Sequence, residues 1–416
     1  MQYDKSISRI LLATSFMSCL TISALAEPTG LIFGKLTGES DFDKAWSAVT
    51  LYKDEDNSVL QEFSLKGRFQ AQTIFGKSDG DSFNTSDLKD SNNAKEPNND
   101  GVWGNDIEVR RARFGFKSKW FQNWKFEGQI DVDTDGHDKN GDESFYRGVY
   151  DFYLTYAQSD ALNISAGKTK VKFGREQEIS SNEILTIERS LVSNLLFPGE
   201  LTGVWANGKG IQDHWLYEAG VYGNDRAREF SKFSSGAIML GKIGYDYASH
   251  AGLDSAVASF QFMHNSQPDL PKIESPNWNG SATPPFSQSI ALTNDIVQGR
   301  FGLTTDVLYG FGDVDQSDVF ALNVIPSYFI ADGLQLVGRL QFATAKEADG
   351  LKLPSRYEGL SASPDATGNT YTSAYLGLNY YIYGHKLKLM NGVEYSHLGG
   401  GDYDGYTLMS GLRLSF

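Results

Sequence analysis

The sequence predicts an all-β fold, a transmembrane antiparallel β-barrel of about sixteen strands whose third loop folds inward and carries a short helix. Three observations lead to this prediction: the composition, the alternation of apolar and polar residues in short segments, and the spacing of those segments. Of the 416 residues only 40% are hydrophobic, yet 13% are aromatic and 43 are glycine. Many alternating strands fit this composition better than a layered helical core.

The first 26 residues have the features of a secretory signal peptide. Two basic residues precede an apolar run from Ile10 to Leu20, and Ala24-Leu25-Ala26 follows as a cleavage site. We therefore expect residues 1–26 to be removed on export. The only cysteine is Cys19, so the mature chain is expected to lack disulfides and Cys-ligated metals. A lipoprotein anchored at Cys19 is the alternative, which the poor lipobox before it disfavours.

The rest of the chain excludes two other classes of protein. No stretch after the signal approaches the roughly 18 consecutive apolar residues that a transmembrane helix needs. The net charge of -15 argues against nucleic-acid binding, which needs a basic surface.

Alternating segments of roughly 9 to 13 residues, the length with which a tilted strand crosses a bilayer, recur along the chain. The last is the clearest, because Leu408, Leu412, Leu414 and Phe416 alternate with small or polar residues. A terminal strand that closes on phenylalanine is similar to those of bacterial outer-membrane barrels. The predicted strands are 60–75, 107–117, 122–133, 149–157, 161–171, 200–208, 212–223, 236–248, 254–264, 287–296, 299–309, 317–329, 333–345, 371–383, 385–397 and 405–416.

The connections between these strands alternate between long and short. The long, polar ones are 76–106, 134–148, 172–199, 224–235, 265–286 and 346–370. The tight ones are 118–121, 158–160, 209–211, 297–298, 330–332 and 384. Outer-membrane barrels have long extracellular loops and short periplasmic turns, whereas a soluble sandwich or propeller has no reason for this alternation.

The chain is therefore divided into a signal peptide (1–26), a periplasmic N-terminal extension (27–59) and a transmembrane barrel (60–416). The even number of strands places both ends of the barrel in the periplasm. The extension could form a β-hairpin or an arm that packs on a neighbouring subunit. It is too short for a separate plug domain.

Three stretches together resemble the phosphate-selective porin O and P family. "VLQEFSLKGRFQAQTIFG" (59–76) resembles the family's first strand with its K-x-G-R-x-Q core. "VRRARFGFKSKWFQNWKFEGQIDVD" (109–133) resembles its arginine-rich second strand, turn and third strand. "GKTKVKFGREQEISSNEILTIERSL" (167–191) resembles the segment that leads into its inward-folded third loop. The resemblance implies homotrimeric, sixteen-stranded outer-membrane channels whose pore is narrowed by the third loop and lined by basic residues that favour anions.

Strand parity predicts which charged residues face the pore. A charge exposed to lipid at mid-bilayer costs roughly 2 to 4 kcal/mol, so the aromatic and aliphatic face must point outward. In the first strand this turns Lys66 and Arg68 toward the lumen. In the second strand it turns Arg111, Arg113 and Lys117 inward and leaves Arg110 near a rim.

The same parity predicts one continuous basic wall in the barrel. Besides the first two strands, the strands near the C-terminus contribute inward basic residues: Arg339, Lys386, Lys388 and Arg413. Closure pairs the last strand with the first, so these residues meet, whereas most inward acids lie on the third to eleventh strands. A transverse field between low-dielectric walls biases ions electrostatically. The alternative is that these are ordinary solvated residues with no shared role.

The third loop, 172–199, is predicted to form the constriction. Its apolar residues are too numerous for an exposed loop, and the spacing 184, 187, 188, 191, 195 predicts a helix that offers Arg189 to water. Beside it lies the densest basic cluster of the chain: Lys168, Lys170, Lys172 and Arg175. Their parity with apolar neighbours requires a bulge at Gly167 or an exit from the membrane. They are predicted to line the constriction; alternatively, they are rim residues that contact lipopolysaccharide phosphates.

A calcium site is a further candidate in "DVDTDGHDKNGD" (131–142). Asp131, Asp133, Asp135 and Asp142 occupy ligand positions of a calcium loop. The flanking strands and the acidic residue at position 8 weaken the match, and a solvated outer loop is the alternative.

The sequence therefore predicts a passive outer-membrane channel that passes small inorganic anions such as phosphate, without a cofactor and surrounded by outer-membrane lipid and lipopolysaccharide. A general or cation-leaning diffusion pore is the alternative within channels, because the lumen is close to neutral overall. A barrel-embedded enzyme and an adhesive or structural barrel are the alternatives from other classes, but no G-x-S-x-G or H-E-x-x-H motif occurs.

Overall fold

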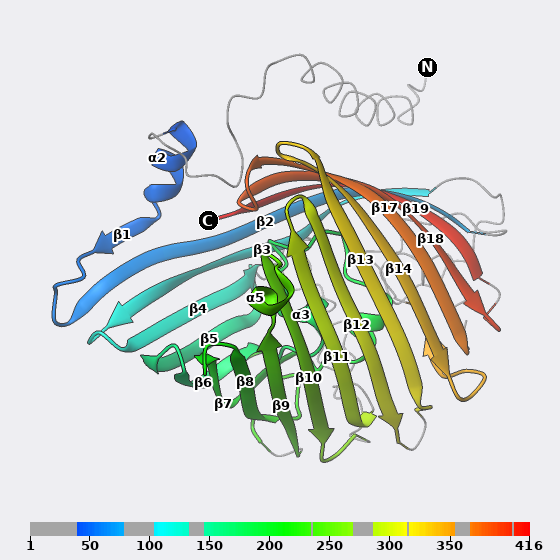
Figure 1. Cartoon of the computed structure of the whole chain (residues 1–416), viewed down its shortest axis with the longest axis horizontal. Helices are drawn as coiled ribbons and strands as arrows, with labels where there is room; N and C mark the ends of the chain where they lie inside the picture. The colour runs from blue at the N-terminus through cyan, green and yellow to red at the C-terminus, as the bar shows by residue number, and fades with distance from the viewer. Residues whose placement is uncertain are drawn as a thin grey trace.

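The computed structural model describes residues 40–78, 104–132, 145–233, 236–268, 286–313, 316–353, 367–401 and 403–416. Sixteen antiparallel strands pair in sequence order, and β19 pairs back with β2, so the sheet closes into a barrel (Figure 1). The barrel strands are β2 (Leu60–Ser78), β3 (Gly104–Trp120), β4 (Trp124–Val132), β5 (Tyr146–Ser159), β6 (Leu162–Lys170), β7 (Glu200–Ile211), β8 (Trp215–Gly223), β9 (Ala237–Asp246), β10 (Ser255–Asn265), β11 (Phe286–Gln298), β12 (Phe301–Gly312), β13 (Val319–Ala331), β14 (Leu334–Ala345), β17 (Thr370–Tyr383), β18 (Leu387–Gly399) and β19 (Tyr403–Ser415).

Each predicted strand coincides with one of these, so the predicted fold class is confirmed. The ends differ by a few residues, mostly because strands extend beyond the apolar alternation. β2 and β3 are the longest strands, with 19 and 17 residues. They extend beyond the segments in which apolar and polar residues alternate.

The barrel is apolar outside and polar inside. Large hydrophobic side chains on the outer face remain exposed, such as Leu340 at 59% and Leu376 at 56%. Inward-facing Gln70, Gln261 and Asn323 are completely buried. This inversion of a soluble protein's pattern is what a barrel surrounded by lipid requires.

The remaining elements are short. They are the helices α2 (Asp41–Ser47), α3 (Arg175–Glu178), α4 (Leu191–Leu195) and α5 (Ala248–Ala251), and the strands β1 (Thr50–Lys53), β15 (Leu351–Lys352) and β16 (Thr367–Gly368). Within the described ranges, no helix has the length and apolar character that crossing a membrane would take.

Residues 40–53 lie against the seam at which the barrel closes. β1 pairs with β2. The indole Nε1 of Trp46 in α2 donates to the carbonyl oxygen of Ser415 at 2.6 Å, and α2 lies near the C-terminus in Figure 1. The ring of Phe42 stacks on that of Tyr383 with centroids 5.4 Å apart. The helix therefore bridges the end of β19 and the turn after β17.

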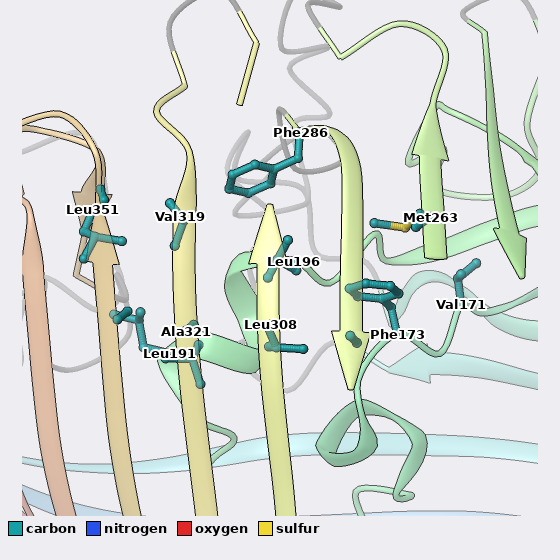
Figure 2. Packing of buried hydrophobic residues seen from close by; sticks show 14 of the residues in the cluster. Val171, Phe173, Leu191, Leu196, Met263, Phe286, Leu308, Val319, Ala321 and Leu351 are labelled. Carbon is teal, nitrogen blue, oxygen red and sulfur yellow. The ribbon is translucent and has the colours of Figure 1, made fainter. Parts of the chain in front are cut away.

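The apolar core lies inside the barrel, where loop 3 (residues 171–199, between β6 and β7) packs on the wall. Figure 2 shows Phe173, Leu191 and Leu196 of this loop against inward residues of the wall such as Leu308. Ile187 packs in a second cluster with inward residues of β2, β13, β14 and β17 to β19. The apolar composition of the loop thus reflects burial on the wall.

The predicted helix over residues 184–195 is only partly present. Helix α4 covers Leu191–Leu195, and α3 covers Arg175–Glu178. Ile184 and Ile187 are buried outside any helix. The helix-like spacing of Ile184 and Ile187 arises because this non-helical segment of loop 3 packs both side chains on the barrel wall.

Candidate functional site

Loop 3 is attached to the barrel wall through its backbone. The carbonyl oxygens of Ile184, Leu185 and Ile187 accept hydrogen bonds from wall side chains: from Lys388 at 2.7 Å, Asn379 at 2.8 Å and Arg413 at 2.9 Å. These donors lie on β18, β17 and β19. Polar side chains of the wall therefore satisfy backbone groups that burial of the loop would otherwise leave unpaired.

The beginning of loop 3 is held on another part of the wall, at β11 and β12. Asp306 of β12 accepts from the backbone N–H groups of Arg175 and Glu176 at the start of α3. The Arg175 guanidinium pairs with Asp295 at 2.7 Å and with Glu178 at 3.2 Å. Burial alone would lower the pKa of Arg175, but these two carboxylates raise it above its usual value. Loop 3 thus spans the lumen from β10–β12 to β17–β19.

Three of the predicted pore-lining residues are covered by this loop. Arg339, Lys388 and Arg413 face inward but are at most 2% exposed. Each one bonds to loop 3 instead of facing water. The prediction that they attract anions in the pore is therefore wrong, because sequence parity gives the face of the wall but not what covers it.

An arginine cluster forms where loop 3 approaches β2 and β3; it consists of Arg68, Arg110, Arg111, Arg113 and Arg189. Arg111 interacts electrostatically with Arg110, Arg113 and Arg189, and Arg68 does so with Arg113 and Arg189. Burial, together with the neighbouring Arg113, lowers the pKa of Arg189 against the opposing effect of nearby anionic groups. Neighbouring like charges disfavour one another's charged form, so groups of opposite charge beside them are stabilising.

Carboxylates and an aromatic ring offset part of this charge. Arg113 pairs with Asp131 and places its guanidinium carbon 3.3 Å from the centre of the Tyr150 ring. Glu188 of loop 3 lies 2.6 Å from Nε of Arg110 and 4.0 Å from Nη2 of Arg111. The cluster keeps more cationic than anionic side chains among these contacts.

Arg110 is placed differently from the prediction. The pairing of β2 with β3 shifts between Gln70 opposite Arg111 and Ala71 opposite Val109, so Arg110 is the extra residue of a β-bulge. A bulge interrupts the alternation and allows two consecutive residues to reach the same side. Arg110 therefore contacts Glu188 inside the barrel instead of lying near a rim.

Lys168 is also placed differently. It stands opposite Phe152 without a register shift at Gly167, so its side chain starts on the outer face of the barrel. It is only 1% exposed, because residues 227 and 228 of loop 4 (residues 224–236) fold over it. Its Nζ donates to the carbonyl oxygens of Ala227 at 2.7 Å and Arg228 at 3.1 Å. The prediction that Lys168 lines the pore is wrong.

The other residues of that predicted cluster lie inside. Lys170 ends β6, donates to the carbonyl oxygen of Gln177 at 2.6 Å, and interacts with Arg111 and Arg189. Lys172 is exposed. Arg175 is in the ion pairs described above.

Three predicted residues lie toward the short-turn end of the barrel. Lys66 pairs with Glu127 at 2.8 Å, and the half-exposed Lys117 pairs with Glu62 at 3.0 Å. Lys386 lies in the turn between β17 and β18, so the prediction that it lines the pore wall is wrong.

The candidate calcium loop falls mostly outside the described residues. Asp133, Asp135 and Asp142 lie there, and Asp131 is the ion-pair partner of Arg113. Within the described ranges no group of three or more His, Cys, Asp or Glu side chains is arranged to hold a metal ion. Calcium binding stays a prediction of the sequence.

Sequence reasoning missed Tyr150 and Glu176, and it did not predict the pairing of Glu394 with Arg339. Tyr150 under Arg113 carries no sequence signal. Glu176 pairs with Arg339 because loop 3 brings it there, whereas Glu394, which faces inward by strand parity, pairs with Arg339 through the register of β14, β17 and β18.

A closed, sixteen-stranded barrel with an apolar exterior and a charged loop in its lumen is a channel protein of the bacterial outer membrane. The sequence profile of the phosphate-selective porin O and P family matches residues 86–348, well over half of the chain. The chain belongs to this family; it is an outer-membrane porin and not an enzyme.

Solved porin structures share the fold at low identity. The outer-membrane channel DcaP of Acinetobacter baumannii is 16% identical, with a TM-score of 0.52 over 88% of this chain and 100% of that one. An anion-selective porin from Comamonas acidovorans is 11% identical, with a TM-score of 0.51 over 85% and 99%. OprB of Pseudomonas putida is 11% identical, with a TM-score of 0.53 over 85% and 94%. No curated protein sequence matches the chain.

Proposed function

We propose that this porin passes small inorganic anions, phosphate among them, through a constriction beside the contact of loop 3 with β2 and β3. The observation that carries this proposal is the arginine cluster. Five guanidinium groups lie there, from two wall strands and from loop 3, with Glu188 and Asp131 as their closest carboxylate partners.

Guanidinium groups suit this task. Arginine stays charged at any physiological pH and presents a planar set of donors that matches phosphate oxygens in pairs. Arg68 and Arg111 already donate to Ser181 and Gln70, which fixes their planes. Several such groups in series can replace part of the hydration of an anion without holding it tightly, which conduction requires.

A general or cation-leaning pore is the alternative function. The observation that favours it is the pairing of Arg110 and Arg113 with carboxylates, which reduces the positive charge available to an anion. Acidic side chains at Glu178 and Asp295 add negative potential on the side of β10–β12.

Single-channel recording separates the two functions. In a planar bilayer with a potassium chloride gradient, we expect the reversal potential to show chloride permeating better than potassium. Added phosphate should reduce the chloride current in a concentration-dependent way. A reversal potential that shows potassium permeating better than chloride would contradict the proposal. A bilayer in which no channel conducts would contradict it as well.

We further propose that three copies assemble through the outer face of β18, β19 and β2. Ser410 stands opposite both Asn391 and Thr73, and its hydroxyl donates to Oδ1 of Asn391 at 2.8 Å. This polar row lies among leucines on the lipid-facing side, where polar groups are costly. A second copy can offer hydrogen-bond partners that lipid cannot. Mass measurement in detergent would test it; a monomer under conditions that preserve channel activity would contradict it.

The remaining partners are proposals of the same kind. Residues 27–59 are proposed to lie in the periplasm, which the contacts of α2 with the end of β19 support. The outer face is proposed to contact outer-membrane lipid, and lipopolysaccharide at loop 4, where Phe230, Lys232 and Phe233 are exposed. Signal cleavage before Glu27 and calcium binding by the 131–142 loop remain to be measured, by N-terminal sequencing and by calorimetry.

A further inference from the structure

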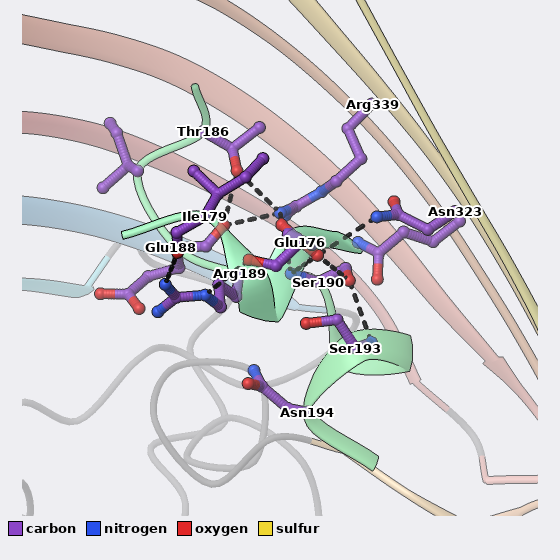
Figure 3. A network of polar contacts seen from close by, with 12 residues as sticks. Glu176, Ile179, Thr186, Glu188, Arg189, Ser190, Ser193, Asn194, Asn323 and Arg339 are labelled. Carbon is purple, nitrogen blue, oxygen red and sulfur yellow. Dashed lines mark hydrogen bonds and ion pairs between the residues drawn. The ribbon is translucent and has the colours of Figure 1, made fainter. Parts of the chain in front are cut away.

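A buried ion-pair network joins loop 3 to the barrel wall behind the arginine cluster (Figure 3). Its centre is Arg339 of β14, whose side chain is 2% exposed. Nη2 of Arg339 contacts both carboxylate oxygens of Glu394 on β18, at 2.9 and 3.0 Å. The guanidinium is thereby fixed to the neighbouring part of the wall.

The other terminal nitrogen of Arg339 holds two separate parts of loop 3. Nη1 lies 3.4 Å from Oε1 of Glu176 at the start of the loop. The same atom donates to the hydroxyl of Thr186 at 3.1 Å and to the carbonyl oxygen of Glu188 at 2.6 Å. One side chain therefore connects the wall with residues 176 and 186–188.

Glu176 closes the loop on itself. Its carboxylate accepts from the backbone N–H of Ser190 at 3.1 Å and from the Ser190 hydroxyl, and Asn323 of β13 donates to it at 3.2 Å. Arg189, next to Ser190, donates to the carbonyl oxygens of Glu176 and Ile179. The start of loop 3 and residues 186–190 are thus held as one unit.

Residues 186–190 have two sides with different partners. On one side, Thr186 and the carbonyl of Glu188 meet Arg339. On the other, the carboxylate of Glu188 meets Arg110, and Arg189 interacts with Arg111 and Arg113. A displacement of this segment would move both charged side chains relative to β3.

From this geometry we infer that Arg339 is a positioning residue for ion selection: it sets the distance between loop 3 and the arginines of β3 without contacting the solute. Removing its charge leaves the carboxylates of Glu176 and Glu394 buried without their cation, which is far more costly than replacing the whole network by neutral groups. The loop then has two arrangements, attached and detached. The inference about selectivity rests on the proposed anion preference, whereas the inference about attachment does not.

The test compares Arg339→Met with the triple variant Arg339→Met, Glu176→Gln and Glu394→Gln in single-channel recordings. For Arg339→Met we expect brief closures at least about tenfold more frequent than in the wild type, because a detached loop moves in the lumen. The ratio of chloride to potassium permeability should fall, although Arg111 and Arg113 are unchanged. The triple variant should recover quiet openings and most of that ratio.

Controls separate position from charge. Arg300→Met removes an arginine from an exposed ion pair with Asp332 in a turn and should match the wild type. If Arg339→Met is quiet and as selective as the wild type, the inference is wrong. If the triple variant stays as unselective as Arg339→Met, Arg339 acts through its charge and the positioning role is also wrong. A wild type without anion preference would refute the proposed function, while the closures would still decide attachment.

A second variant guards against misfolding. If Arg339→Met fails to give the heat-modifiable mobility of a folded barrel in electrophoresis, Thr186→Val removes one of the contacts of Arg339 and keeps all charges. We expect a smaller increase in closures for Thr186→Val. Wild-type behaviour of a folded Thr186→Val variant would then overturn the inference.

Discussion

The guanidinium carbon of Arg113 lies 3.3 Å from the centre of the Tyr150 ring, so this cation of the arginine cluster is stacked on an aromatic face. Its Nε donates to Asp131 on the neighbouring strand β4. A stacked, paired guanidinium has one orientation, which lysine cannot reproduce. Arg113 therefore presents a fixed charge beside Arg111 and Arg189.

Reversing the charge of this part of the wall should reverse ion preference. For the double variant Arg111→Glu and Arg113→Glu, we expect the chloride-to-potassium permeability ratio to fall at least about tenfold, equivalent to about 1.4 kcal/mol. The reversal potential in a salt gradient measures it. Lys386→Glu, in a turn outside the cluster, is the matched control. An unchanged potential in the double variant would mean that the cluster does not set selectivity.

Lys168 should matter for stability but not for selectivity. Lys168→Met removes two hydrogen bonds to the backbone of loop 4, so we expect the free energy of unfolding to fall by about 1–3 kcal/mol. Loop 4 should also become more sensitive to trypsin, which cleaves after residues such as Arg228 and Lys232. Urea unfolding and limited proteolysis measure the two effects.

The exposed Lys172 provides the control for this prediction, because Lys172→Met removes a lysine of the same segment without a bond to loop 4. A loss of anion preference in Lys168→Met as large as in the arginine double variant would contradict its position on the outer face.

Acid should weaken the barrel through His385, in the turn between β17 and β18. Burial, and then the positive charge of Lys388, lower the pKa of the imidazole to about 4, below its usual 6.5. The unfolded chain thus binds a proton at a higher pH than the folded one. This contribution to stability is complete above pH 6.5 and is lost as the pH falls toward 4, reaching about 2 kcal/mol near pH 5.

Thermal unfolding in detergent at several pH values measures this loss. His385→Gln should show a shallower decline between pH 6.5 and 4 than the wild type. His250→Gln, at an exposed position on α5, should follow the wild type. Parallel curves for the wild type and His385→Gln would show that His385 is not the group responsible.

The alternation of apolar and polar residues in the sequence was by itself enough to predict the barrel wall of this protein. The sixteen strands, their order and the closure of the last strand on the first follow from a period of two, because lipid on one side and water on the other force that period on every strand. The same rule assigned Arg111 and Arg113 to the inner face, where both are found in the arginine cluster.

Only the tertiary structure decided what each inward charge does. Arg339, Lys388 and Arg413 obey the parity rule, yet loop 3 covers them and uses them to hold its own backbone. Arg110 departs from the parity rule because it lies in a β-bulge. Lys168 obeys the parity rule and points outward, but loop 4 covers it. These outcomes depend on contacts between residues as much as 226 positions apart, such as Arg413 with Ile187. Local periodicity carries no information about such pairs, because it fixes the face of a side chain and not the partner that folds against it.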